Sequence, residues 1–148
     1  MATQAIVPML AYEHGIAALE WLVKAFGFTE RKDMRMIDDN GRLSHGELEL
    51  DNNIIMLASP TPDYESPQQH RQHCEQARKW SRVPWIINGL LVYVSDVDAH
   101  YERAKAAGAV ILSAPEDGFP GRRYRCEDLE GQRWMFMQQE HSQPSTAI

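Results

Sequence analysis

The sequence predicts an α+β fold that pairs two similar β-α-β-β-β units. Residues 7–12 and 89–94 are short apolar segments, and each is followed by a polar turn and an amphipathic helix that ends at a glycine. Three further strand-like segments follow each helix. Repetition of a whole supersecondary unit favours a fold made by joining the two copies, because neither copy buries its apolar surface alone.

The first unit is predicted to occupy residues 5–58. Apolar residues recur with helical spacing from Ala17 to Phe26, and Gly27 is the expected C-cap. Asp38–Gly41 has the composition of a hairpin turn, and residues 51–53 form a second predicted turn. The strands expected around them are 5–12, 28–36, 44–50 and 54–57.

The second unit is predicted to repeat this order over residues 88–139. Its helix is expected at 97–107, and its strands are expected at 88–94, 109–113, 121–127 and 132–138. Between the units, the segment 59–87 begins with a proline-rich stretch and continues as a polar run, which predicts an extended linker followed by an exposed helix. Residues 140–148 are expected to form a flexible tail, and residues 1–148 a single domain.

Composition narrows the classes of function. The chain has 148 residues and a net charge of −6, which opposes binding to nucleic acid because phosphate neutralisation needs a clustered basic surface. No apolar run reaches the ~20 residues of a membrane span, and the N-terminus lacks a signal peptide's pattern. A cytoplasmic protein is expected, in which Cys74 and Cys126 are reduced thiols.

Four phrases, in their order along the chain, resemble one known family. They are Ala17-Ala-Leu-Glu-Trp-Leu-Val-Lys-Ala-Phe-Gly-Phe28, Val94-Ser-Asp-Val-Asp-Ala99, Ala106-Ala-Gly-Ala109 and Glu127-Asp-Leu-Glu-Gly-Gln-Arg-Trp134. They are similar to recurring phrases of the vicinal oxygen chelate (VOC) superfamily, which contains glyoxalase I, bleomycin resistance proteins and extradiol dioxygenases. Ser44-His-Gly-Glu-Leu48 adds a similarity to its PhnB-like, glyoxalase-related branch. The resemblance covers about residues 5–138.

The resemblance implies the glyoxalase/bleomycin resistance/dihydroxybiphenyl dioxygenase-like fold, in which curled mixed sheets form a cup. It also implies a homodimer, formed side by side or by exchange of units. Metalloenzymes of this family take His, Gln or Glu ligands from the first and last strand of each unit. The matching positions in this chain are Val7, Met56, Gly89 and Met135.

None of these four residues is a hard metal ligand, so no cofactor is predicted, and a divalent metal is expected only if this placement is wrong. If the four positions are each shifted by one residue, Asn88 is the only one with a side chain that could bind a metal. His70 and Cys74 would share a helix face in the linker, but no second ligand pair accompanies them, so a solvated helix is favoured.

Alternation along the strands places a further set of side chains on the face of the cup. The candidate ligand-binding residues are Met9, Met56, Leu91, Tyr93, Arg125, Arg133 and Met135. Thioethers adapt to flat or irregular molecules, so this lining suits a largely apolar or aromatic ligand. The alternative is that the methionines fill the core between helix and sheet.

Two polar strands allow additional roles. His45 and Glu47 share one face of a strand and are weak candidates for a catalytic acid–base pair, although a solvated polar face opposite buried leucines is favoured. Arg123 and Arg125 alternate with Tyr124. Either arginine would suit a carboxylate or phosphate, and a solvated arginine face with Tyr124 inward is favoured.

These observations predict a metal-independent small-molecule binding protein of the glyoxalase/bleomycin-resistance type that sequesters or carries its ligand. The alternative is a glyoxalase-like lyase, isomerase or dioxygenase acting on a small molecule. A third possibility is an interaction module that uses the segment 59–87. The partners expected are a small molecule and a second copy of the chain, with no nucleic acid and no membrane.

Overall fold

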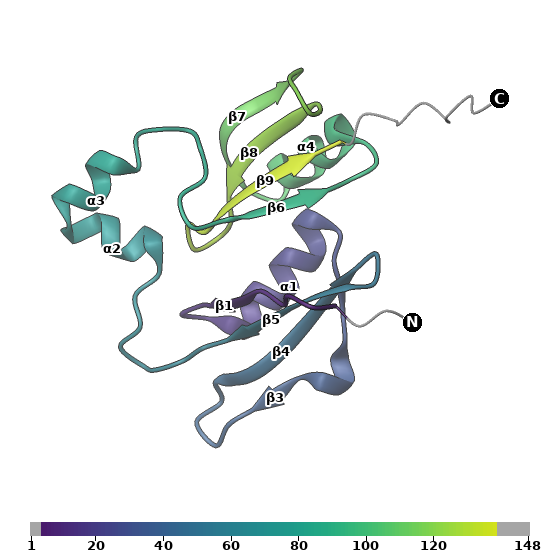
Figure 1. Cartoon of the computed structure of the whole chain (residues 1–148). Helices are drawn as coiled ribbons and strands as arrows, with labels where there is room; N and C mark the ends of the chain where they lie inside the picture. Colours follow the sequence, from purple (N-terminus) through teal and green to yellow (C-terminus); the bar gives the residue numbers. More distant parts are fainter. Residues whose placement is uncertain (1–3, 139–148) are drawn as a thin grey trace.

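The computed structural model describes residues 4–138 and confirms the predicted fold class (Figure 1). Two mixed sheets, each accompanied by one long helix, are joined by a segment that carries two short helices. The predicted tail, and residue 139 at the end of the second predicted unit, lie outside the described residues.

The first sheet lies in the lower half of Figure 1. Its strand order is β1-β5-β4-β2, with β3 pairing to β4, and β1 runs parallel to β5. Helix α1 connects β1 to β2. The elements are β1 (Met9–Ala11), α1 (Gly15–Phe26), β2 (Thr29–Glu30), the 3-10 turn η1 (Lys32–Met34), β3 (Met36–Ile37), β4 (Leu43–Leu50) and β5 (Asn53–Ala58).

The second sheet repeats this topology without an extra short strand. Its order is β6-β9-β8-β7, and β6 runs parallel to β9 as β1 does to β5. The elements are β6 (Leu90–Tyr93), α4 (Val97–Ala106), β7 (Val110–Glu116), β8 (Arg123–Glu127) and β9 (Arg133–Met137).

The expected strand 28–36 is wrong as one continuous element. It is divided into β2 and β3 by η1, where Arg35 turns back so that its guanidinium binds both carboxylate oxygens of Glu30 at 2.7 and 2.8 Å. The turns around it follow the prediction. Asp51 and Asn52 have φ values of 48° and 66°, as a tight hairpin between β4 and β5 requires.

Helix α1 ends and packs where its sequence indicates. Gly27 has φ 80° and its N–H donates to the Val23 carbonyl, which is the predicted left-handed C-cap. Close packing of the helix on β4 depends on Gly46, because a Cβ there would lie 2.9 Å from the Leu19 side chain. The helix therefore lies directly on the middle of the first sheet.

One apolar core spans both units. Phe26 from the end of α1 contacts Trp134 and Phe136 of β9, with ring centroids 5.1 and 4.7 Å apart. The Trp21 indole N–H donates to the Ala107 carbonyl at the end of α4 over 2.9 Å. The two units are therefore held together through their helices and the core faces of their sheets.

The connecting segment is more ordered than an extended linker with one helix. It contains α2 (Pro67–His73) and α3 (Glu75–Trp80), which project to one side of the molecule (Figure 1). Ser66 caps α2 by accepting a hydrogen bond from the Gln69 N–H. Within residues 4–138, no helix has the length and apolar character needed to cross a membrane.

Candidate functional site

Each sheet has one face in the core and one open face. In the second sheet, Leu90, Trp134 and Phe136 point into the core. Their neighbours along the strands point the other way, and strand register aligns them in rows. The central row is Leu91, Met135, Arg125 and Ser113, and the next row is Tyr93, Met137, Arg123 and Glu116.

The first sheet has a similar row. Met9 of β1 lies beside Met56 of β5, which lies beside Glu47 of β4. Leu48 and Leu57, on the alternate positions, are buried against α1. We call the sides that carry Met9 and Leu91 the open faces of the two sheets.

All seven predicted ligand-binding residues lie on the open faces, and their part in binding stays a prediction. Met9, Leu91 and Tyr93 are 78%, 45% and 44% exposed, which is high for large apolar side chains in strands. Met56, Met135 and Arg125 are half-buried. None of the three methionines is enclosed between helix and sheet, so the alternative core-filling role is wrong for them.

Arg133 differs from the rest of this set because it is only 4% exposed. Its guanidinium donates to the carbonyls of Ser81, Val83 and Trp85 at 2.6 to 2.7 Å and to Glu127 at 3.1 Å. Arg133 thereby fixes the loop that leads into β6. The three carbonyl partners could not be predicted from the sequence, because they lie about 50 positions earlier in the chain.

Arg125 occupies the centre of the second open face. One of its terminal nitrogens donates to Ser113 and Glu116 at 3.1 and 3.2 Å. Its Nε is buried and has no hydrogen-bond partner among the described residues. A buried donor of this kind is unfavourable until an acceptor reaches it. Tyr124 is fully buried beside it, so the predicted inward orientation of that ring is confirmed.

The expectation that His45 and Glu47 form a solvated face is wrong for Glu47. This carboxylate is 4% exposed and accepts from His45 Nε2 at 2.7 Å and from Arg31 Nη1 at 3.0 Å. Arg31 lies just after β2, which pairs with β4, so the fold supplies the cation that a buried carboxylate needs. The pair predicted from alternation is therefore formed.

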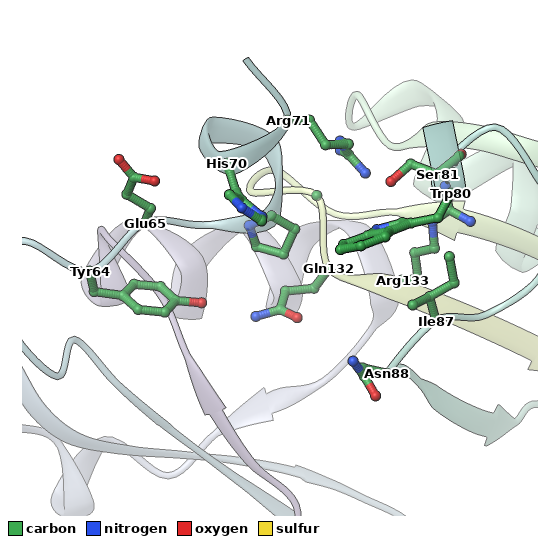
Figure 2. A pocket seen from close by; sticks show the side chains of 12 residues that line it. Tyr64, Glu65, His70, Arg71, Trp80, Ser81, Ile87, Asn88, Gln132 and Arg133 are labelled. Carbon is green, nitrogen blue, oxygen red and sulfur yellow. Dashed lines mark hydrogen bonds between the residues drawn. The ribbon is translucent and has the colours of Figure 1, made fainter. Parts of the chain in front are cut away.

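A pocket of about 350 Å³ lies between the linker and the start of β9 (Figure 2). In this view Tyr64 and the Trp80 indole stand on opposite sides, with His70 above and Gln132 below. Asn88, which has φ 54°, borders the pocket at the entrance to β6. His70 thus lines a pocket, and Cys74 is half-buried at the break between α2 and α3.

Buried hydrogen bonds near this pocket link the two units. Asp128, in the β8–β9 turn, accepts from the Tyr12 hydroxyl at 2.6 Å and from the Trp134 indole at 3.0 Å. Glu130 accepts from the backbone N–H groups of Glu13 and His14 at 2.6 and 2.9 Å, which ties the β8–β9 turn to the segment just before α1. Burial, and then the Asp128 carboxylate, raise the pKa of Tyr12, so its phenol stays a proton donor.

Comparison with known proteins supports the assignment suggested by this architecture. The family model described as "Glyoxalase/Bleomycin resistance protein/Dioxygenase superfamily" matches residues 8–136. The chain belongs to this superfamily.

Relatives of the chain within the superfamily include proteins without a known function. The uncharacterized proteins Mb0911c of Mycobacterium bovis and Rv0887c of Mycobacterium tuberculosis are each 31% identical to it over 135 residues. These matches cover 88% of this chain, 80% of Mb0911c and 71% of Rv0887c.

Solved structures share the superfamily fold. TioX from Micromonospora sp. ML1 is 28% identical, with a TM-score of 0.66, over 93% of this chain and 100% of TioX. TnmS3 from Streptomyces sp. CB03234, described as an antibiotic binding protein, is 18% identical, with a TM-score of 0.65, over 95% of this chain and 99% of TnmS3.

The superfamily's usual metal positions do not fit a hard divalent ion in this chain. Val7 has no donor atom, and Met56 and Met135 offer only thioethers. A side chain at Gly89 is sterically excluded, because a Cβ there would overlap the Arg133 carbonyl oxygen and the Ile86 side chain. Within the described part of the chain, no three His, Cys, Asp or Glu side chains are arranged to hold a metal.

Proposed function

We propose that the chain is a metal-independent small-molecule binding protein of the glyoxalase/bleomycin-resistance type, which holds a largely apolar or aromatic ligand on its open faces. The observation that carries this proposal is the exposure of Met9, Leu91 and Tyr93 on strands whose other faces form a closed core. Large apolar side chains that stay exposed on a protein surface are typical of ligand or partner sites. The description of TnmS3 as an antibiotic binding protein supports the same class of function.

The open faces suggest how such a ligand is held. Methionine side chains are flexible and polarizable, so Met56 and Met135 adapt their shape to a planar molecule. Tyr93 adds an aromatic face and a hydroxyl, and Arg125 adds a donor without a partner among the described residues. Apolar enclosure supplies affinity, while these polar groups orient the ligand.

A second copy of the chain completes the site in this proposal. In one chain Met9 and Leu91 remain accessible to water on β1 and β6, which are both edge strands. Exposed edges and apolar faces are unfavourable unless another surface covers them. We therefore expect a homodimer in solution, with ligand enclosed between open faces, and light scattering after size exclusion measures its mass.

The proposal is tested with the uncharged fluorescent probe N-phenyl-1-naphthylamine. We expect saturable binding to the wild-type protein and at least tenfold weaker binding to Leu91→Asp, because a carboxylate then lies within the apolar face. The matched control is Ile37→Asp, since Ile37 is similarly exposed but lies on β3, which is separated by β4 from the strand that carries Met56. Equal affinity of both variants would contradict the proposed site, as would the absence of binding to wild type.

An isomerase is the second candidate function, favoured by the 2.7 Å contact between His45 and Glu47 on the first open face. Such a pair would move a proton next to a carbonyl group without a metal. The test is deuterium incorporation from D₂O into hydroxyacetone, followed by NMR. Incorporation that is lost in Glu47→Gln would favour the enzyme, and incorporation at the uncatalysed rate would reject it.

A further inference from the structure

A basic groove of about 670 Å³ lies beside the second open face, beneath the linker helices. Its lining residues come from α2, α3, the loop after α3, and the sheet. They include Arg71, Arg78, Arg82 and Arg133, together with Glu127 and Leu112 from the sheet. We call this feature the arginine groove.

The groove concentrates positive charge in a chain whose net charge is −6. Glu127 is its one acidic lining residue, and it accepts from Arg71 at 2.8 and 3.0 Å and from Arg133 at 3.1 Å. Four guanidinium groups therefore face one carboxylate, which leaves an excess of three positive charges. Buried pairing fixes Arg71 and Arg133, whereas Arg78 and Arg82 are exposed.

The two exposed arginines have little else to bind. Arg78 donates to the carbonyl oxygens of Arg71 and Gln72 at the end of α2. Arg82 has no ion pair or side-chain hydrogen bond to any other described residue. Guanidinium groups in such a cluster suit an oxyanion, which accepts two parallel N–H bonds from one arginine.

Strand register joins the arginine groove to the proposed apolar site. Arg133 and Met135 are two positions apart on β9, and Glu127 and Arg125 are two positions apart on β8, so each pair shares a face and is separated by about 7 Å along its strand. The buried Nε of Arg125 lies on the same side as the groove and beside Met135. The central row of the second open face therefore lies next to two residues, Arg133 and Glu127, that line the arginine groove.

We propose that the ligand is an amphipathic anion, with an apolar or aromatic body on Leu91 and Met135 and an oxyanion group in the arginine groove. This inference rests on the proposed binding function and adds the chemical class of the ligand. A carboxylate, sulfonate or phosphate would pair with Arg78 and Arg82, whereas a neutral or cationic molecule leaves the excess charge of the groove uncompensated.

The test compares two probes that differ by one group. These are 1-anilinonaphthalene-8-sulfonate and N-phenyl-1-naphthylamine, which has the same rings without the sulfonate. We expect the double variant Arg78→Gln, Arg82→Gln to bind the sulfonate about tenfold more weakly and the neutral probe within twofold of wild type. Raising the salt concentration should weaken only the sulfonate, because the groove is open to solvent.

A matched control removes the same charge elsewhere. Lys24→Gln, Lys105→Gln also lowers the net charge by two, at exposed positions on α1 and α4. Equal loss of sulfonate affinity in both double variants would contradict the arginine groove as the anion site, since the effect would then come from the electrostatic field of the whole protein. Unchanged affinity in Arg78→Gln, Arg82→Gln would also overturn it. Circular dichroism melting checks that each variant is folded.

The possible results distinguish failure of the anionic-ligand proposal from failure of the proposed binding function. If Leu91→Asp weakens the binding of both probes and the groove variant changes neither, the apolar site is supported and the anionic ligand is rejected. If the wild-type protein does not bind the neutral probe but binds the sulfonate in a way that depends on Arg78 and Arg82, the apolar site is rejected and the arginine groove is supported as an anion site. Loss of sulfonate affinity in both Leu91→Asp and the groove variant supports one continuous amphipathic site.

Discussion

The Tyr12–Asp128 hydrogen bond is expected to stabilise the junction between the two units. The hydroxyl and the carboxylate are 2.6 Å apart, both residues are buried, and they are separated by 116 positions in the sequence. Replacing Tyr12 by Phe keeps the ring and removes only the donor. Asp128 keeps the Trp134 indole and the N–H groups of Glu130 and Gln132 as donors, so its charge is not left bare.

The expected loss is about 2 kcal/mol in the free energy of unfolding, within the range of about 1.5–3 kcal/mol for hydrogen bonds to charged groups. For a domain of about 150 residues this corresponds to a fall in Tm of about 4–8 °C. The measurement is urea unfolding followed by tryptophan fluorescence, at one protein concentration because a dimer couples assembly to folding. The m-value should stay unchanged.

The matched control is Tyr101→Phe. The Tyr101 hydroxyl makes no hydrogen bond within residues 4–138, and its ring packs against Tyr124 with centroids 5.4 Å apart, a contact that the substitution keeps. We expect a change below about 0.5 kcal/mol for this surface hydroxyl. The reasoning is refuted if Tyr12→Phe and Tyr101→Phe lose the same stability, because the buried bond would then contribute nothing specific.

Three more predictions concern stability and pH. Burial lowers the pKa of His100 below its ordinary 6.5, so on acidification the unfolded chain binds a proton before the folded chain does, and the folded state loses stability. The urea midpoint should therefore fall between pH 7 and pH 5, and it should fall less in His100→Gln. Glu130→Ala leaves the N–H groups of Glu13 and His14, just before α1, without their acceptor and should cost about 1–2 kcal/mol in urea unfolding. An unchanged midpoint would show that water replaces the Glu130 carboxylate. Gly46→Ala should lower Tm by several degrees, because the added methyl group overpacks against Leu19. Ser44→Ala, at an exposed position, loses only a 3.1 Å hydrogen bond to the Met36 carbonyl and should lower Tm less. A larger fall in Ser44→Ala than in Gly46→Ala would contradict the close approach of α1 to β4.

Much of the candidate site follows from local sequence, because alternation along a strand is a local property. Leu91 and Tyr93 are two positions apart, as are Arg133 and Met135, and each pair shares a face wherever the strand lies. Which face stays open could not be decided in this way. That depends on where α1 and α4 pack, and it is their apolar core with Trp134 that leaves Leu91 and Tyr93 of β6 accessible on the other side of the sheet.

The polar residues show where reasoning from sequence fails. Glu47 was expected to be solvated, but Arg31 and His45 make its burial tolerable. Arg133 was predicted to offer a charge to the ligand, which stays a prediction, but the sequence did not indicate that its guanidinium also holds the loop of Ser81–Trp85. The arginine groove had no sequence signature, because Arg71, Arg78 and Arg82 lie in a linker that is held beside the sheet by distant residues, among them Glu127 and Arg133.

Local sequence was enough to predict the repeated order of strands and helices, the helix end at Gly27, the turn at Asp51–Asn52, and the two-residue alternation of faces. These features depend on backbone preferences and side-chain spacing within a few residues. Tertiary structure alone decided which polar groups are paired, which apolar face is uncovered, and that the groove adjoins the open face of β9. The reason is physical: burial and charge pairing depend on segments that meet in space, and Tyr12 and Asp128 lie 116 positions apart along the chain.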